Sequence, residues 1–165
     1  MLSIHIITVG RDKERWVTDQ IEHYRKFLRK YAQVELTTVP EVKYTRATDI
    51  DRARANEADA IRSRLKGGYV IALDAGGKSL STEEFADDLS RLQVEGHSLI
   101  EFIIGGPYGL HDSLKAAKKK SNEGSSPDLV LSLSPLTMSH QIVRLVLLEQ
   151  LYRALNLNAG GGYHK

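Results

Sequence analysis

The chain of 165 residues contains no cysteine. Disulfide bonds, thiolate nucleophiles and zinc sites with cysteine ligands are therefore excluded. The six histidines show no paired ligand spacing, so we expect no metal centre. No apolar run reaches the length of a membrane-spanning helix, and residues 2–9 are too short and wrongly flanked for a signal peptide. These absences predict a cytoplasmic protein without a membrane partner.

A large excess of charge of one sign is also missing, since the formal net charge is +2. A weakly basic chain permits a nucleic-acid partner but does not demand one. The sequence contains no internal repeat and no stretch with the composition of a domain linker. We therefore expect a single domain over residues 1–165.

Three common catalytic motifs are incomplete or absent. Residues 72–79 (ALDAGGKS) resemble a phosphate-binding loop, but alanine replaces the first glycine, and Ala72 and Leu73 belong to an apolar run. NTP hydrolysis is thus a minor alternative, and an assay for magnesium-dependent hydrolysis of NTP would reveal it. Residues 105–109 (GGPYG) lack the spacing of a dinucleotide fingerprint, and no G-x-S-x-G sequence of a serine hydrolase occurs.

What the sequence does contain is a regular alternation of strand and helix patterns. Apolar, β-branched runs predict strands at residues 2–9, 34–39, 69–73, 99–104 and 129–133. Helical spacing predicts helices at residues 13–31, 48–65, from the Ser81–Glu84 capping box to Gly96, 113–120, and from 140 onward. Residues 74–78 read as a turn and residues 122–127 as a flexible loop. The alternation predicts a single-domain α/β fold, a mostly parallel sheet with helices on both faces.

The most informative stretch is residues 131–154, in which a strand, a tight Ser/Thr-rich loop and a helix follow one another. Apolar residues from Ile142 to Leu155 surround almost the whole helix. Such a helix must be covered on all sides, which predicts packing on the chain's own sheet and on a second subunit. His140 and Arg144 are four residues apart and share one face beside the loop.

Gly- or Ser-rich loops follow three of the expected strands, after Leu73, Ile104 and Leu133. In an open α/β sheet, ligands bind at the carboxyl ends of the strands. We therefore expect these three loops to converge on one pocket. The two adjacent glycines at 105 and 106 would let a ligand approach the backbone closely.

Three stretches together resemble one known family. They are residues 102–110 (FIIGGPYGL), residues 131–154 (LSLSPLTMSHQIVRLVLLEQLYRA) and the terminal Tyr163-His164. Their combination resembles the RlmH family, the bacterial ribosomal RNA large-subunit pseudouridine N3-methyltransferases of the SPOUT class. The resemblance spans the chain and is strongest from Tyr69 onward. The loop at residues 118–128 is longer than the family pattern, and Ser139 stands where proline is common.

The resemblance implies a SPOUT-type fold with a C-terminal trefoil knot and a homodimer. It also implies methylation of N3 of a pseudouridine in 23S ribosomal RNA of the large subunit, with S-adenosyl-L-methionine as cofactor and the ribosome as partner. The implied cofactor contacts are Leu73, Gly105, Leu133, Ser134, Pro135, Leu136, Thr137 and Met138.

Four residues are expected to carry catalysis. His140 and His164 are titratable near neutral pH and could remove the imide proton. Arg144 could hold a phosphate or a base carbonyl, and Tyr163 could stack on a base. From the residues alone, a helix-cap or interface role is favoured for His140 and Arg144, and the resemblance shifts that balance towards catalysis. The glycines at 160–162 suggest a hinge that would let the terminal Tyr163-His164 close over the target.

Basic side chains are candidate phosphate contacts, although a solvated face explains most of them equally well. They are Arg25, Lys26, Arg29, Lys30 and residues 118–120. The alternative from another class is a non-catalytic RNA- or ribosome-binding module on the same fold. Cofactor binding separates the two hypotheses, because such a module would not need the pocket.

Overall fold

The computed structural model describes residues 1–118 and 126–163. Within these residues one sheet contains five parallel strands in the order β2-β1-β4-β3-β5. The strands are β1 (Leu2–Val9), β2 (Ala32–Val39), β3 (Tyr69–Ser79), β4 (Leu99–Ile104) and β5 (Leu129–Ser132). The α/β class and the parallel sheet are thus confirmed. Since all the strands run the same way, their carboxyl ends share one edge of the sheet.

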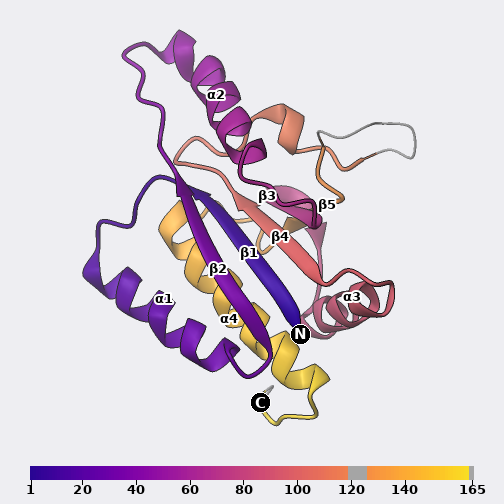
Figure 1. The fold of residues 1–165 in the computed structure, drawn as a ribbon. Coiled ribbons are helices and arrows are strands. Elements are labelled where there is room, and N and C mark those ends of the chain that lie inside the picture. Colours follow the sequence, from indigo (N-terminus) through magenta and orange to yellow (C-terminus); the bar gives the residue numbers. More distant parts are fainter. Residues whose placement is uncertain (119–125, 164–165) are drawn as a thin grey trace.

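Helices cover both faces of this sheet. On one face, α1 (Arg15–Leu28), α3 (Thr82–Val94) and α4 (His140–Asn158) pack into a core with Ile4, Ile71 and Phe102. On the other face, α2 (Ile50–Arg62) packs against Ile7 and Ile103. Figure 1 shows α1 and α4 side by side along the sheet. The expected helices on both faces are confirmed, and none of those described is both long and apolar enough to cross a membrane.

The expected turn at residues 74–78 is wrong, because β3 continues to Ser79. Leu131 of β5 pairs with Leu73 and, after an irregularity, with Lys78. The residues between Leu73 and Lys78 therefore bulge out of the ladder. An added Cβ at Gly77 would lie 2.7 Å from the Val130 carbonyl oxygen, so glycine permits this close contact.

The expected helix at residues 113–120 is also wrong within the described part. A single 3-10 turn, Asp112–Leu114, is followed by irregular chain to Lys118, whose amide donates to the Pro127 carbonyl at 2.7 Å. Most of the loop expected at residues 122–127 lies outside the described residues. The helices expected at 13–31 and 48–65 are shorter than expected, and a 3-10 turn (Ala47–Asp49) precedes α2.

Side chains define how α3 and α4 begin. Ser81 and Glu84 form the expected capping box of α3. The Ser139 hydroxyl accepts a hydrogen bond from the Ile142 amide at 3.3 Å and caps α4. From this cap α4 runs for 19 residues, or roughly 28 Å at 1.5 Å per residue. One end of α4 therefore lies at the carboxyl edge of the sheet and the other end at the opposite edge (Figure 1).

Candidate functional site

A cavity of about 690 Å³ opens beside the bulge of β3 and the carboxyl ends of β4 and β5. The loops after Leu73, Ile104 and Leu133 all line it, as the positions of their glycines and serines predicted. Of the residues expected to contact a cofactor, every one except Pro135 lines the cavity: Leu73, Gly105, Leu133, Ser134, Leu136, Thr137 and Met138. The segment after Leu73, which the structure shows to be a bulge in β3, contributes Asp74 and Ala75 to the lining.

Residues 105–110 form a tightly folded wall of the cavity. The Gly109 amide donates to the Gly106 carbonyl at 2.9 Å, closing a turn with Pro107 and Tyr108 at its tip. An added Cβ at Gly105 would lie 2.5 Å from the Gly109 carbonyl carbon and 2.6 Å from the Leu110 nitrogen. Because both atoms belong to the backbone, only glycine fits at position 105.

His140 is the first residue of α4 and lies on the rim of the cavity. An added Cβ at Gly10 would lie 4.0 Å from His140 Nε2 and 3.5 Å from Glu41 Oε2, so Gly10 of the loop after β1 lies between the imidazole and Glu41 of the loop after β2. Burial, followed by the nearby Arg144 guanidinium, lowers the pKa of His140 below its ordinary value. The neutral imidazole is therefore the favoured form near pH 7.

Arg144 is 1% exposed and joins α4 to the end of β1. Its guanidinium pairs with Asp12 and donates to the Val9 and Gly10 carbonyls, each at 2.8 Å. Burial lowers the pKa of Arg144, and Asp12 opposes that shift. A direct contact with an RNA phosphate is not open to this side chain in the arrangement described, because it is buried and both terminal nitrogens already donate to protein acceptors.

Tyr163 lies at the opposite end of α4 from the cavity. Its ring packs 4.7 Å from the Tyr152 ring and 4.9 Å from the Arg153 guanidinium carbon. Its amide donates to the Asn156 side chain at 3.1 Å, and Gly161 packs so closely on Asn156 that a Cβ there would clash. Residues 160–163 thus form a turn against Asn156, and the expected hinge stays a prediction. His164 lies outside the described residues.

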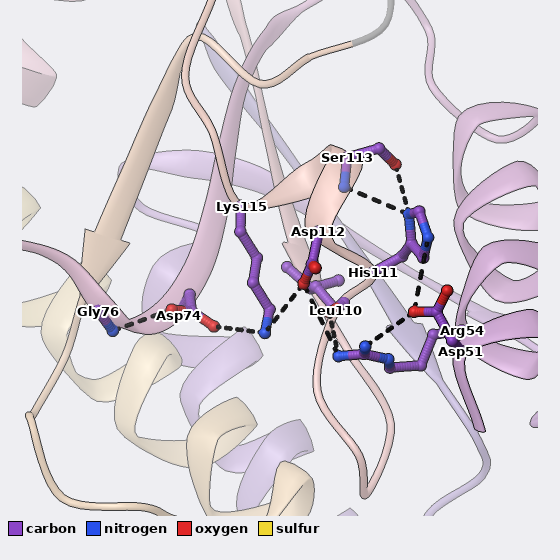
Figure 2. Close-up of polar contacts among 9 residues, drawn as sticks. All are labelled: Asp51, Arg54, Asp74, Gly76, Leu110, His111, Asp112, Ser113 and Lys115. Carbon is purple, nitrogen blue, oxygen red and sulfur yellow. Dashed lines mark hydrogen bonds and ion pairs between the residues drawn. The ribbon is translucent and has the colours of Figure 1, made fainter. Parts of the chain in front are cut away.

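A chain of polar contacts includes Asp74 and Leu110, two residues that line the cavity (Figure 2). Lys115 lies between Asp74 of the β3 bulge and Asp112, at 3.8 and 3.9 Å. Arg54 of α2 continues the chain by pairing with Asp51 at 2.9 Å and donating to the Leu110 carbonyl at 3.4 Å. Partly exposed ion pairs each contribute little. Together these contacts link α2, the loop after β4 and the β3 bulge.

Sequence reasoning missed the loops after β1 and β2. They bring Gly10, Asp12, Glu41 and Tyr44 to the same edge as the cavity. The signal was present, since a parallel sheet places every strand's carboxyl end at one edge. No group of three or more His, Cys, Asp or Glu residues in the described part of the chain could hold a metal ion.

Comparisons with known proteins identify the family. Residues 2–164 match the family model described as "Predicted SPOUT methyltransferase". Over 168 residues the chain is 39% identical to the "Ribosomal RNA large subunit methyltransferase H" of Lactobacillus delbrueckii subsp. bulgaricus, covering 99% of the chain and 100% of the relative. Relatives of the same name from Alkaliphilus oremlandii and Listeria monocytogenes are 41% and 39% identical with equal coverage. The chain therefore belongs to the SPOUT methyltransferases, in the family of ribosomal RNA large subunit methyltransferase H.

Proposed function

We propose that this protein methylates N3 of a pseudouridine in 23S ribosomal RNA of the large subunit, with S-adenosyl-L-methionine as cofactor. The observation that carries the proposal is the cavity enclosed by the bulge of β3 and the loops after β4 and β5. The names of the relatives support the substrate class. A ribosomal substrate also agrees with the cytoplasmic location expected from the sequence.

The cavity has the chemistry that the cofactor requires. Apolar side chains such as Leu73, Leu133 and Met138 would hold the adenine ring, while the backbone of the surrounding loops offers donors and acceptors. Gly105 contributes backbone without a side chain to the wall, because the tight turn beyond it leaves no room for a Cβ. When bound, S-adenosyl-L-methionine would supply the methyl group. The contacts proposed are Leu73, Gly105 and residues 133–138, including Pro135, whose carbonyl could contribute although its side chain lies off the cavity.

His140 is proposed to accept the imide proton of the target base. Its lowered pKa keeps the imidazole neutral and able to accept a proton at neutral pH. Arg144 is proposed as a positioning residue, because it fixes the loop after β1 against the helix that carries His140. Holding the reactants in line supplies much of the rate of a displacement reaction.

The roles expected of Tyr163 and His164 require a second subunit. Since α4 is roughly 28 Å long, the tail of one chain cannot reach the cavity of the same chain without unfolding its terminal turn. We therefore propose a homodimer in which the tail serves the partner's cavity. An uncovered aromatic row supports the dimer: His23, Phe27, Tyr152 and Tyr163 contact one another in sequence across α1 and α4. The trefoil knot stays a prediction.

The experiment uses ribosomes from a strain that lacks this protein, with methylation mapped by mass spectrometry of 23S RNA. The full chain should restore one N3-methylpseudouridine, and deleting residues 163–165 should lower the rate by about two orders of magnitude or more while cofactor affinity is kept. His140→Ala should cause a comparable loss at pH 7. A protein that binds S-adenosyl-L-methionine but leaves the RNA unmodified would contradict the proposed substrate.

A further inference from the structure

Two tyrosines from different loops form a pair at the mouth of the cavity. Tyr108 lines the cavity, is 54% exposed and stands at the tip of the turn at residues 106–109. Tyr44, from the loop after β2, contacts it edge to face, with ring centroids 5.1 Å apart and an interplanar angle of 70°. Neither ring belongs to the apolar cores of the two sheet faces, so the pair leaves aromatic surface beside the cavity.

Hydrogen bonds hold the two segments that carry the rings in place. Pro107 and the Gly109–Gly106 hydrogen bond fix the turn that carries Tyr108. The loop that carries Tyr44 is anchored two residues earlier, where the Val42 amide donates to Glu57 Oε1 at 3.0 Å. Desolvation first, and then a hydrogen bond with Tyr108, raise the pKa of Tyr44 to about 12. The phenol therefore carries no charge that would repel a phosphate.

A polar hollow of about 230 Å³ includes Tyr44 in its lining. Its lining includes the cations Lys43 and Arg52, the neutral donors Thr45 and Asn56, and one carboxylate, Asp49. Arg52 lies 3.8 Å from Asp49, a long and largely exposed pair. Lys43 is exposed and has no ion pair within residues 1–118 and 126–163. The hollow thus offers donors and a surplus of positive charge to an anion.

Cavity, aromatic pair and hollow are therefore contiguous, because Tyr108 lines the cavity, Tyr44 lines the hollow and the two rings are in contact. Single-stranded nucleic acid repeats the same two features, bases that stack on aromatic rings and phosphates that bind cations. We propose that Tyr44, together with Tyr108, stacks on the unpaired base next to the target nucleotide, and that the hollow of Lys43 and Arg52 binds the phosphate of that neighbour. This inference rests on the proposed RNA substrate and names how that substrate is positioned.

The decisive variant is Tyr44→Ala, because Tyr44 does not line the cavity and its truncation removes no side chain from the cavity's lining. With ribosomes lacking the modification, the KM for ribosomes should rise about 5- to 100-fold, the effect of losing one base-stacking ring. The Kd for S-adenosyl-L-methionine, measured by titration calorimetry, should not change. Tyr44→Phe keeps the ring and should restore most of the affinity for ribosomes.

The phosphate contact has its own readout. Lys43→Ala and Arg52→Ala should each weaken the binding of ribosomes. The slope of the logarithm of the binding constant against the logarithm of salt concentration should also become shallower, by roughly the contribution of one phosphate contact. Arg64→Ala is the matched control, since Arg64 is exposed and lies just beyond the end of α2, away from the site. Arg64→Ala should leave both the affinity and the salt dependence as in the wild type.

Two results would overturn the inference. One is an unchanged KM for ribosomes in Tyr44→Ala. The other is a KM change that Tyr44→Phe does not repair and that accompanies weaker cofactor binding, which would make Tyr44 a support of the cavity. Binding of a short fluorescent single-stranded RNA to wild type and Tyr44→Ala tests the stacking site directly. If wild type binds that RNA through Tyr44 but does not methylate ribosomes, the proposed function fails and the stacking site stands.

Discussion

At the scale of single residues, Gly105 is the position where one added carbon has the clearest effect. Gly105→Ala would place Cβ within 2.6 Å of backbone atoms of Gly109 and Leu110, so the turn would have to move. We expect S-adenosyl-L-methionine to bind at least about tenfold more weakly, a change of roughly 1.4 kcal/mol. Gly162→Ala is the control, because nothing lies within 4 Å of its added Cβ. Titration calorimetry with equal affinities for both variants would contradict the assignment.

Glu57 is a residue whose charge opposes folding. Burial raises its pKa, the Val42 amide partly offsets that shift, and Glu41 adds to it. An acid with a raised pKa binds its proton more tightly in the folded state, so stability falls as pH rises through that pKa. Glu57→Gln removes the charge and keeps an acceptor for Val42. Thermal unfolding should show Glu57→Gln as the more stable protein at pH 7, with the difference shrinking as pH falls through the raised pKa of Glu57.

The pH dependence of catalysis follows from His140. Its lowered pKa means that the folded protein resists protonation of the imidazole at mildly acidic pH. If His140 accepts the imide proton, kcat should therefore stay on its plateau below pH 6.5 and decline only as the depressed pKa is reached. A pH–rate profile measured on ribosomes provides the test. A decline centred at or above pH 6.5 would argue against His140 as the base.

At the scale of whole elements, the cap of α4 combines stability and binding. Ser139→Ala removes the bond to the Ile142 amide and should cost about 1 kcal/mol. That loss corresponds to a Tm lower by about 2–4 °C for a chain of this size. Ser139 also lines the cavity, so cofactor affinity should fall as well. Ser81→Ala in the cap of α3 is the control and should lower Tm by a similar amount without changing cofactor affinity. If Ser81→Ala weakened cofactor binding as much as Ser139→Ala does, the loss would come from lower stability and not from the cavity.

The elements also show how far the sequence could predict the fold. The strands at residues 2–9 and 99–104 were predicted with their true bounds, because long apolar runs end there at glycines. The continuation of β3 was missed, since Asp74 and two glycines are typical of a turn, and pairing with β5 overrides that preference. The contact of Arg144 with Asp12 could not be predicted from the sequence either. It joins residues 132 positions apart, and spacing within one helix says nothing about such a partner.

At the scale of the whole molecule, the proposed dimer can be tested on the exposed side of α4. Ile142 is 37% exposed, so Ile142→Glu should leave the monomer folded but separate the subunits. Light scattering after size exclusion should then give the mass of one chain. Val94→Glu on α3 is the control, because Val94 is 86% exposed on a different surface and should keep the dimer mass. Leu147 and Leu148 are fully buried within one chain, so glutamate there would test the core.

The separation of the cavity and Tyr163 by the length of α4 has a genetic consequence. If each tail serves the other subunit, a chain with a defective cavity and a chain without its tail carry complementary lesions. Coexpressed in a strain lacking the native protein, Gly105→Ala and a chain ending at residue 162 should pair into heterodimers with one intact site. RNA modification should then reappear in cells where neither allele alone supports it. If the RNA stays unmodified when the two alleles are coexpressed, the tail does not act in the cavity of the partner subunit.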